Sequence, residues 1–259
     1  MRISMLFTDI IYGPVHSRRL GISLGVNLLP LHSKLCNFDC IYCECGWNAD
    51  NRSLQPRFNA REAIREALRA TLLKMRGEGA LPDVITFAGN GEPTLHPEFE
   101  SIIEDTIALR DEYAPDAKIS VLSNATQLHS EGVVRALRRV DNAILKIDSA
   151  LERTAQQMNK PCGNYSVEAV EKSLRAFGGE FVLQTMFLRG EYDGERVDNT
   201  TSEEIEAWLR LVERLRPRQV MVYSIDRATP CKELEKVSHE ELEDIAVRVR
   251  ALGIACSAS

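Results

Sequence analysis

Hydrophobic positions along this chain follow two patterns that alternate. Short runs rich in Val, Ile, Leu and Phe are each followed by a longer segment whose apolar residues recur every three or four positions. The first pattern predicts buried strands, and the second predicts amphipathic helices. The predicted strands are 22–28, 83–88, 118–123, 143–148, 181–187 and 219–225, and the predicted helices pass through 60–75, 99–107, 133–137, 167–174, 205–215 and 242–249.

Signals at the helix ends agree with this division of the chain. Three predicted helices open with Asn, Ser or Thr followed three residues later by Glu, at 59–62, 201–204 and 238–241. That spacing is typical of a capping box at a helix N-terminus. Gly77 and Gly253 fit the ends of the first and last of these helices.

Six strand–helix units in strict alternation predict an α/β fold with a parallel sheet and helices outside it. Six units are too few for a closed eight-stranded barrel, so a partial (β/α)6 barrel of the TIM type or a doubly wound sheet fits. In both folds ligands collect at the carboxyl ends of the strands. The length of 259 residues is normal for one such unit, and we expect one domain over residues 1–259.

Composition and charge narrow the possible partners. The net charge of -6 argues against binding nucleic acid by bulk attraction to phosphate, although Arg18-Arg19 leaves a local contact open. A second basic group at 135–139 is expected to be solvated surface. We find no apolar run long enough for a membrane span and no cleavage site after the N-terminal apolar residues, which Asp9 interrupts. A cytoplasmic protein is expected.

The most specific chemical signal is the cysteine loop, residues 36–45. It contains Cys36-x3-Cys40-x2-Cys43, and four of the seven cysteines lie within it. Three thiolates this close can ligate one compact iron–sulfur cluster and leave one iron open for catalysis. A structural zinc site is the alternative, but zinc commonly takes two separated C-x2-C pairs. Cys45 could supply a fourth ligand.

A glycine turn, residues 88–94, directly follows the second predicted strand. Gly89 and Gly91 there would let the backbone approach a ligand closely. A nucleotide-binding G-x-G-x-x-G motif does not fit, because Thr94 replaces the last glycine and Pro93 delays the helix. A plain strand-to-helix turn is the remaining alternative.

Polar side chains interrupt the later strands, where a parallel sheet should be apolar. Lys146 and Asp148 lie two residues apart and so share one face of the fourth strand. Gln184 interrupts the fifth strand, and Tyr223 lies near the end of the sixth. We predict catalytic roles for these four residues, because buried polar groups are costly unless they have a task. The alternative is a Lys–Asp pair that only stabilises the fold.

Together the cysteine loop and the glycine turn resemble the radical-SAM superfamily. The cysteine run matches that family's C-x3-C-x-aromatic-C motif, with Tyr42 in the aromatic position. The segment 89–92 resembles the family's glycine–glutamate motif, and the six βα units resemble its partial barrel. Segments 13–25 and 89–97 further resemble the branch that contains the wyosine-forming tRNA enzymes and bacterial relatives of unassigned substrate.

This resemblance implies two cofactors and a reaction. A 4Fe-4S cluster on the three cysteines would bind S-adenosyl-L-methionine and cleave it reductively, and the resulting 5′-deoxyadenosyl radical would abstract hydrogen from a substrate. A one-electron reductant such as flavodoxin or ferredoxin would be a partner. By the same resemblance, the residues that bind S-adenosylmethionine would be Tyr42, Gly89, Asn90, Gly91, Glu92, Ser123 and Asn124.

Three functions remain open at this point. The first is a radical-SAM enzyme acting on a small molecule, peptide or protein, and the second is a tRNA-modifying enzyme of the wyosine type. The third is a non-catalytic iron–sulfur or zinc module. Cys45, Cys162 and Cys231 could belong to a second cluster or to the substrate site, but buried or incidental thiols are the simpler interpretation.

Overall fold

The computed structural model describes residues 6–17, 21–51 and 57–259. Arg18-Arg19, the predicted local phosphate contact, lies outside the described residues.

The centre of the molecule is an eight-stranded, mostly parallel sheet in the order β1-β2-β3-β4-β5-β6-β9-β11. All neighbouring strands are parallel except β1, which runs antiparallel to β2. Within the described ranges β1 and β11 are the two edges, so the sheet is open. The strands are β1 (Ile11–Ser17), β2 (Gly21–Val26), β3 (Val84–Phe87), β4 (Lys118–Ser123), β5 (Asn142–Lys146), β6 (Val182–Met186), β9 (Gln219–Tyr223) and β11 (Ala255–Ala258).

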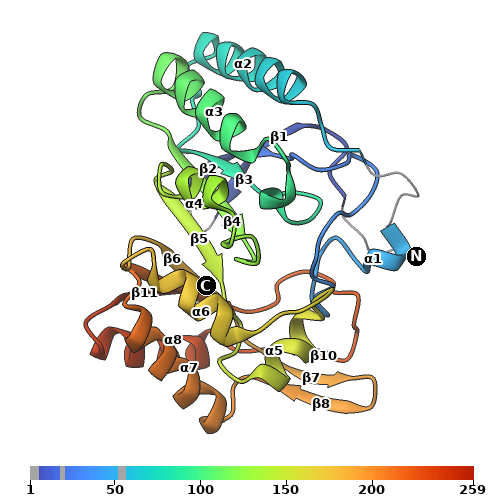
Figure 1. The fold of residues 1–259 in the computed structure, drawn as a ribbon, viewed down its shortest axis with the longest axis vertical. Coiled ribbons are helices and arrows are strands. Elements are labelled where there is room, and N and C mark those ends of the chain that lie inside the picture. The colour runs from blue at the N-terminus through green and yellow to red at the C-terminus, as the bar shows by residue number, and fades with distance from the viewer. Residues whose placement is uncertain (1–5, 18–20, 52–56) are drawn as a thin grey trace.

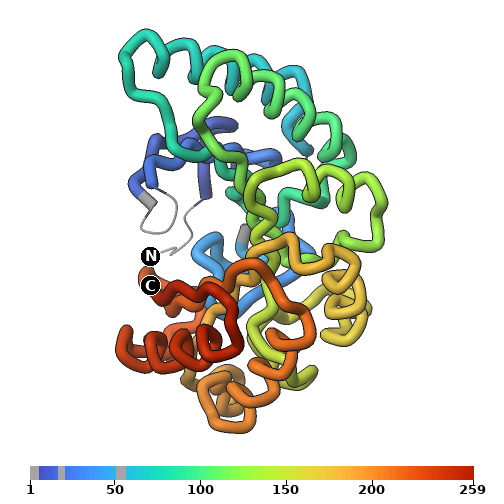
Figure 2. The backbone as a smooth tube through the Cα atoms, turned by 90° about the vertical axis from the view of Figure 1, so that its left-hand side faces the viewer, coloured from blue at the N-terminus to red at the C-terminus, as the bar shows by residue number. Residues whose placement is uncertain are grey.

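All six predicted strand–helix units are present, and the partial barrel is confirmed. Alternate strand residues such as Leu24, Ile85 and Leu145 pack against the helices in one apolar core. The helices follow the outside of the curved sheet, from α2 at one end to α8 at the other (Figures 1 and 2). They are α2 (Arg61–Gly77), α3 (Phe99–Tyr113), α4 (Glu131–Leu137), α6 (Val167–Arg175), α7 (Ser202–Leu215) and α8 (His239–Ala251).

Several short elements that the hydrophobic pattern did not predict gather near the cysteine loop (Figure 1). A small antiparallel sheet in the order β10-β7-β8 follows β6, and α5 follows β5. These elements are α1 (Asn48–Asn51), the 3-10 helix η1 (Pro93–Leu95), α5 (Glu152–Asn159), β7 (Leu188–Tyr192), β8 (Glu195–Asp198) and β10 (Leu234–Lys236).

The inward face of the sheet is half polar. Near the middle of the barrel Ile144, Val182 and Met221 form a small apolar cluster. Two residues further along β5 and β6, Lys146 lies beside Gln184 in the parallel register. The interior therefore changes from apolar to polar toward the carboxyl ends of the strands.

The helix-capping predictions hold for only part of the chain. Ser238 makes the predicted capping box, and Thr201 caps α7 through its side chain. The predicted box at Asn59 is wrong: Ala60 is the N-cap of α2, and the Asn59 amide instead donates to the carbonyls of Asn27 and Leu29. Asn59 thus ties the start of α2 to the end of β2.

Within the described part of the chain, no helix is both long enough and apolar enough to span a membrane.

Candidate active site

The cysteine loop is held by hydrogen bonds from three other parts of the chain. On one side, Leu35 pairs with Gly91 in a parallel bridge, so the loop begins against the glycine turn. On another side, Asp39 N and Ile41 N donate to the carbonyls of Asn159 and Met158, at 3.0 Å each. The loop that follows β9 donates from Cys231 N to the Ile41 carbonyl, and Arg227 pairs with Glu44. The backbone of the loop is therefore fixed at the carboxyl ends of the parallel strands.

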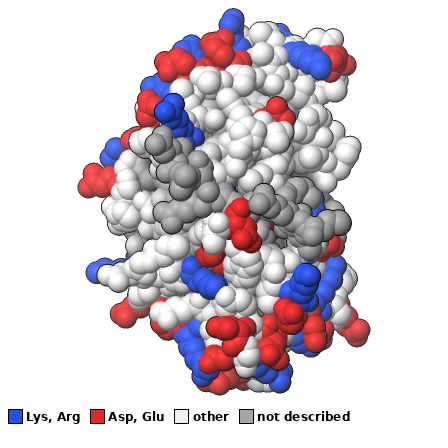
Figure 3. All heavy atoms as spheres, turned by 90° about the vertical axis from the view of Figure 1, so that its right-hand side faces the viewer, with Lys and Arg blue, Asp and Glu red and all other residues white. Residues whose placement is uncertain are grey.

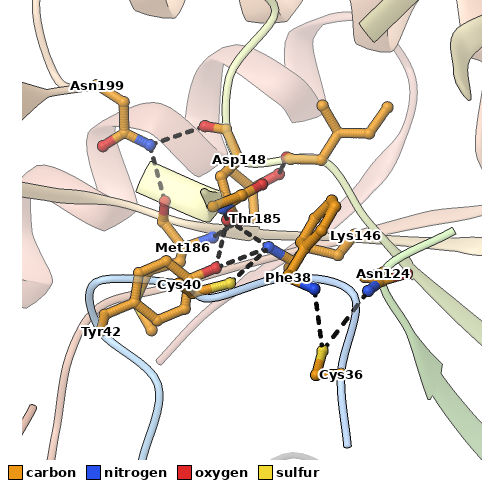
Figure 4. Close-up of polar contacts among 12 residues, drawn as sticks. Cys36, Phe38, Cys40, Tyr42, Asn124, Lys146, Asp148, Thr185, Met186 and Asn199 are labelled. Atoms are coloured by element: carbon orange, nitrogen blue, oxygen red, sulfur yellow. Dashed lines mark hydrogen bonds and ion pairs between the residues drawn. The ribbon is translucent and has the colours of Figure 1, made fainter. Parts of the chain in front are cut away.

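The three cysteines lie on one short loop, and each sulfur has a hydrogen-bond donor beside it. The Phe38 N–H donates to Cys36 Sγ at 3.4 Å, and the Asn124 amide lies 3.9 Å from the same sulfur. Lys146 Nζ lies 3.7 Å from Cys40 Sγ. Figure 4 shows how these donors converge on the loop. Such donors stabilise sulfur in its thiolate form, which is the form that ligates a metal.

Cys43 has the most strongly stabilised thiolate of the three. The Cys45 thiol donates a hydrogen bond to it, and the Lys34 ammonium group adds a second contact, so the pKa of Cys43 lies below its ordinary value. Burial acts in the opposite direction on the other two thiols, raising the pKa of Cys36 and raising that of Cys40 to about 11. The surroundings of Cys43 thus favour the thiolate more than those of Cys36 and Cys40 do.

The donor set fits a four-iron cluster. Three thiols project from one short loop, as the ligands of such a cluster do. Among the described residues, no three His, Cys, Asp or Glu side chains converge closely enough to hold a single metal ion. The alternative of a mononuclear zinc site, which needs such convergence, gains no support from this geometry.

The glycine turn packs against the cysteine loop itself. A Cβ atom on Gly91 would lie 1.9 Å from the Leu35 carbonyl oxygen, and its φ of +137° favours glycine. Leu35 N donates to the Asn90 carbonyl, and Glu92 N donates to the Leu35 carbonyl. The sequence predicted that the backbone of this turn approaches a ligand closely. The structure shows a close approach of a different kind, between the backbone of the turn and Leu35 at the start of the cysteine loop.

The side chains of the glycine turn connect neighbouring strands. Glu92 is buried, and its carboxylate accepts from Asn124 N at 2.7 Å and from Thr94. Burial raises the pKa of Glu92. The Asn90 amide bonds to the backbone of Phe7 and Pro30. Glu92 and Asn124, two predicted cofactor-binding residues, therefore lie side by side beyond the carboxyl ends of β3 and β4.

Lys146, Asp148 and Tyr42 form one buried polar cluster (Figure 4). Lys146 Nζ donates to Asp148 Oδ2 at 2.8 Å and to the Tyr42 hydroxyl oxygen at 2.9 Å. The Tyr42 hydroxyl also bonds to Asp148 Oδ2, which accepts from the Asn159 amide at 2.6 Å as well. Asp148 Oδ1 accepts from Met186 N. The cluster links β5, β6 and α5 to the cysteine loop.

This geometry changes the interpretation of Asp148. Its side chain is 0% exposed, and four donors occupy its two oxygens. We therefore interpret Asp148 as an anchor of the cysteine loop, which was the structural alternative, instead of a group that meets substrate. Lys146 remains 13% exposed and lies beside Gln184 on the inward face. Tyr223 belongs to the same surroundings, since it packs against the apolar cluster that contains Tyr42 and Met186.

Four residues that position the site carried no sequence signal. Lys34 is buried within the loop region, and Asn27 accepts from Asn90 N and so supports the glycine turn. Asn159 and Asn199 hold Asp148 through their amides. Lone polar residues at element ends are common, so only the fold reveals these roles.

Two cavities lie at opposite ends of the strands. The larger, about 540 Å³, is lined by residues at the amino ends, such as Asp83 and Lys118, and is remote from the cysteines. The smaller, about 370 Å³, lies between Trp47, Tyr192 and Cys231, beside the cysteine loop. Ligands of such folds bind at the carboxyl ends of the strands, so of these two cavities the smaller is the better candidate for a ligand site.

The fold and the cysteine loop together define an α/β partial-barrel protein with an iron–sulfur type of thiol set. The family model described as the radical SAM superfamily matches residues 31–201, and the chain belongs to this superfamily. The cofactors typical of this superfamily are a 4Fe-4S cluster and S-adenosylmethionine.

The chain is also similar to curated proteins from other organisms. The chain is 26% identical over 244 residues to a protein named GTPase Obg from Brachyspira hyodysenteriae, covering 93% of this chain and 33% of the relative. It is 28% identical over 238 residues to a UPF0026 protein from Helicobacter pylori, covering 90% of this chain and 71% of the relative. The chain thus spans only a third of the length of the first of these relatives.

The fold is similar to that of solved radical SAM proteins. A radical SAM methyltransferase from Sphaerobacter thermophilus matches with a TM-score of 0.68 and 15% identity, over 92% of this chain and 65% of that one. An archaeal TYW1 matches with a TM-score of 0.54 and 14% identity, over 88% and 71%. At these identities the likeness establishes the fold.

Proposed function

We propose that Cys36, Cys40 and Cys43 hold the 4Fe-4S cluster and that the chain cleaves S-adenosylmethionine reductively to act on a further substrate. The observation that carries this proposal is the arrangement of three thiols on one loop, each beside a hydrogen-bond donor, at the carboxyl ends of the parallel strands. The fourth coordination position of such a cluster would be free for S-adenosylmethionine.

When bound, the cluster and S-adenosylmethionine supply a 5′-deoxyadenosyl radical that takes a hydrogen atom from the substrate. The protein's task is to bind, orient and exclude water. The glycine turn and Ser123-Asn124 follow the carboxyl ends of β3 and β4 and are joined by the bond from Asn124 N to Glu92. Both meet the cysteine loop, through the Leu35–Gly91 bridge and the bond from Asn124 to Asn37. This supports a role for both segments in binding S-adenosylmethionine, with Tyr42 nearby.

The inward polar residues are the proposed contacts to substrate. Lys146 and Gln184 share the interior face, and Tyr223 ends the neighbouring strand β9. Around them, an apolar cluster that includes Phe38, Ile41 and Met186 encloses the cysteine loop. Such a shell excludes water from a radical reaction.

We further propose a one-electron reductant such as flavodoxin or ferredoxin as a partner and the cytoplasm as the location. In the described part of the chain the seven cysteines form no disulfide, which is compatible with a reducing compartment. The substrate we favour is a small molecule, peptide or protein. On the face shown in Figure 3, basic and acidic side chains of the described residues are intermixed. An intermixed surface does not favour binding of a polyanion.

A tRNA substrate is the second candidate, favoured by the resemblance of residues 13–25 and 89–97 to the wyosine-forming branch. Against it, Arg135 and Arg139 of the second basic group pair with Glu100 and Glu104. Filter binding of bulk tRNA at 50 and 200 mM salt tests this candidate. A tRNA enzyme would bind at low salt and lose affinity steeply, since phosphate contacts release counterions.

Iron content tests the cluster assignment. After anaerobic reconstitution we expect about four irons per chain in the wild type. Alanine at any of the three loop cysteines should reduce this severely. Cys256→Ala is the matched control, because Cys256 lies on β11 outside the loop and should keep full iron. Full iron in all three loop variants would contradict the assignment.

A further inference from the structure

Lys34 is a buried cation at the base of the cysteine loop. Its side chain is 1% exposed, and its ammonium group donates to Asp39 Oδ1 at 3.1 Å and to the Gly46 carbonyl at 2.7 Å. Gly46 N donates in turn to the Cys43 carbonyl at 2.9 Å, so the ammonium group lies beside the turn that carries the Cys43 thiol. A chain of contacts through Asp39 and Lys34 thus leads from the interior of the loop to the turn of one proposed cluster ligand.

Lys146 forms a second chain of the same kind from β5. Its ammonium group donates to Asp148 Oδ2 at 2.8 Å and lies 3.7 Å from Cys40 Sγ (Figure 4). The same group lies 4.9 Å from the centre of the Phe38 ring. The Lys34 and Lys146 ammonium groups come from different parts of the fold, and each lies beside a different one of the three cysteines.

Charge near an iron–sulfur cluster acts on its reduction potential. Adding one electron makes the cluster and its thiolates more negative, so a nearby cation stabilises the reduced state more than the oxidised state. The effect is strong where water is excluded, and both lysine side chains are largely enclosed. Positive charge raises the potential, and negative charge lowers it.

We propose that Lys34 and Lys146 are positioning residues that set the reduction potential of the cluster on Cys36, Cys40 and Cys43. This inference rests on the proposed function. The step concerned is the transfer of one electron from a low-potential one-electron donor to the oxidised cluster.

A simple structural role would give a different result. Lys34 also ties the two ends of the loop together through Gly46, so a substitution could disturb the loop without any electrostatic effect. Removing either partner of the Lys34–Asp39 pair changes the local charge in opposite directions, which separates an electrostatic role from a structural one. Lys34→Met removes a positive charge, whereas Asp39→Asn removes a negative charge and keeps an Oδ1 that can accept from Lys34 and from Asn48 N.

The experiment is a redox titration of the reconstituted protein with dithionite, followed by the electron paramagnetic resonance signal of the reduced cluster. At a fixed potential, Lys34→Met should lower the ratio of reduced to oxidised cluster at least tenfold, which is 59 mV for one electron. Asp39→Asn should raise the ratio. Lys146→Met should lower it, and Lys118→Met, at the opposite end of β4, should leave it unchanged.

The outcomes distinguish this inference from the proposed function. If Lys34→Met assembles no cluster, Asp39→Asn and Lys146→Met still decide the result. Shifts of the same sign in Asp39→Asn and Lys146→Met, or potentials equal to that of the wild type, would overturn the inference while wild-type cleavage of S-adenosylmethionine leaves the proposed function standing. A wild type that binds no cluster would overturn both.

Discussion

Asp148→Asn tests the anchoring role that the buried polar cluster assigns to Asp148. The substitution keeps the size of the side chain but replaces one carboxylate oxygen by an amide donor. Oδ2 is the oxygen at risk, because it accepts from Lys146, Tyr42 and Asn159. After the change, Oδ1 can keep its bond from Met186 N, and the new amide faces groups that donate.

The expected loss of stability follows from these contacts. The Tyr42 hydroxyl can rotate and accept, but the Lys146 ammonium group has only hydrogens to offer, and Asn159 directs its NH2 group at this position. Each buried donor left without a partner costs about 1–3 kcal/mol. Two such donors give about 2–6 kcal/mol, in agreement with the roughly 3–5 kcal/mol typical of a broken buried ion pair. For a chain of this size, the melting temperature should fall on the order of 10 °C.

Denaturant unfolding of the cluster-free protein and iron content after reconstitution measure this effect. Asp111→Asn is the matched control, because it makes the same chemical change in an exposed ion pair with Arg110 and should cost less than about 1 kcal/mol. We expect Asp148→Asn to lose both stability and iron. A loss below about 1 kcal/mol, combined with a large loss of 5′-deoxyadenosine per cluster, would refute the anchoring role and restore a catalytic one.

Two further substitutions test local contacts. Gly91→Ala should prevent cluster assembly, since the new Cβ would meet the Leu35 carbonyl at 1.9 Å, whereas Gly79→Ala, at a φ of +67° with no atom within 4 Å, should cost about 1–2 kcal/mol and keep full iron. Equal iron in the two variants would contradict the packing of turn on loop. Ser238→Ala should cost about 1 kcal/mol by removing the capping box with Glu241, as thermal unfolding would detect.

The strand–helix alternation was predictable because burial imposes it on the sequence. Strands covered on the outside by helices must be nearly continuous apolar runs, so β3 and β6 were evident as VITF and VLQTM. The antiparallel strands were not predicted. β8 is only four residues long and half exposed, so its sequence ERVD carries no hydrophobic alternation that would distinguish it from a loop.

The cysteines were predictable for a different reason. The three proposed cluster ligands lie close together in sequence, so the spacing of Cys36, Cys40 and Cys43 is itself the signal. The residues around them come from distant segments: Lys146 meets Cys40 across 106 positions. A single lysine such as Lys34 is uninformative in a sequence, and only its burial in the fold gives it meaning.

Formation of 5′-deoxyadenosine tests the central claim most directly. The reconstituted wild type would be incubated anaerobically with dithionite and S-adenosylmethionine, beside Cys43→Ala and the control Cys256→Ala. We predict 5′-deoxyadenosine and methionine in equal amounts from the wild type and from Cys256→Ala, and none above background from Cys43→Ala. A wild type that carries four irons but forms no 5′-deoxyadenosine, or a Cys43→Ala variant as active as the wild type, would contradict the account.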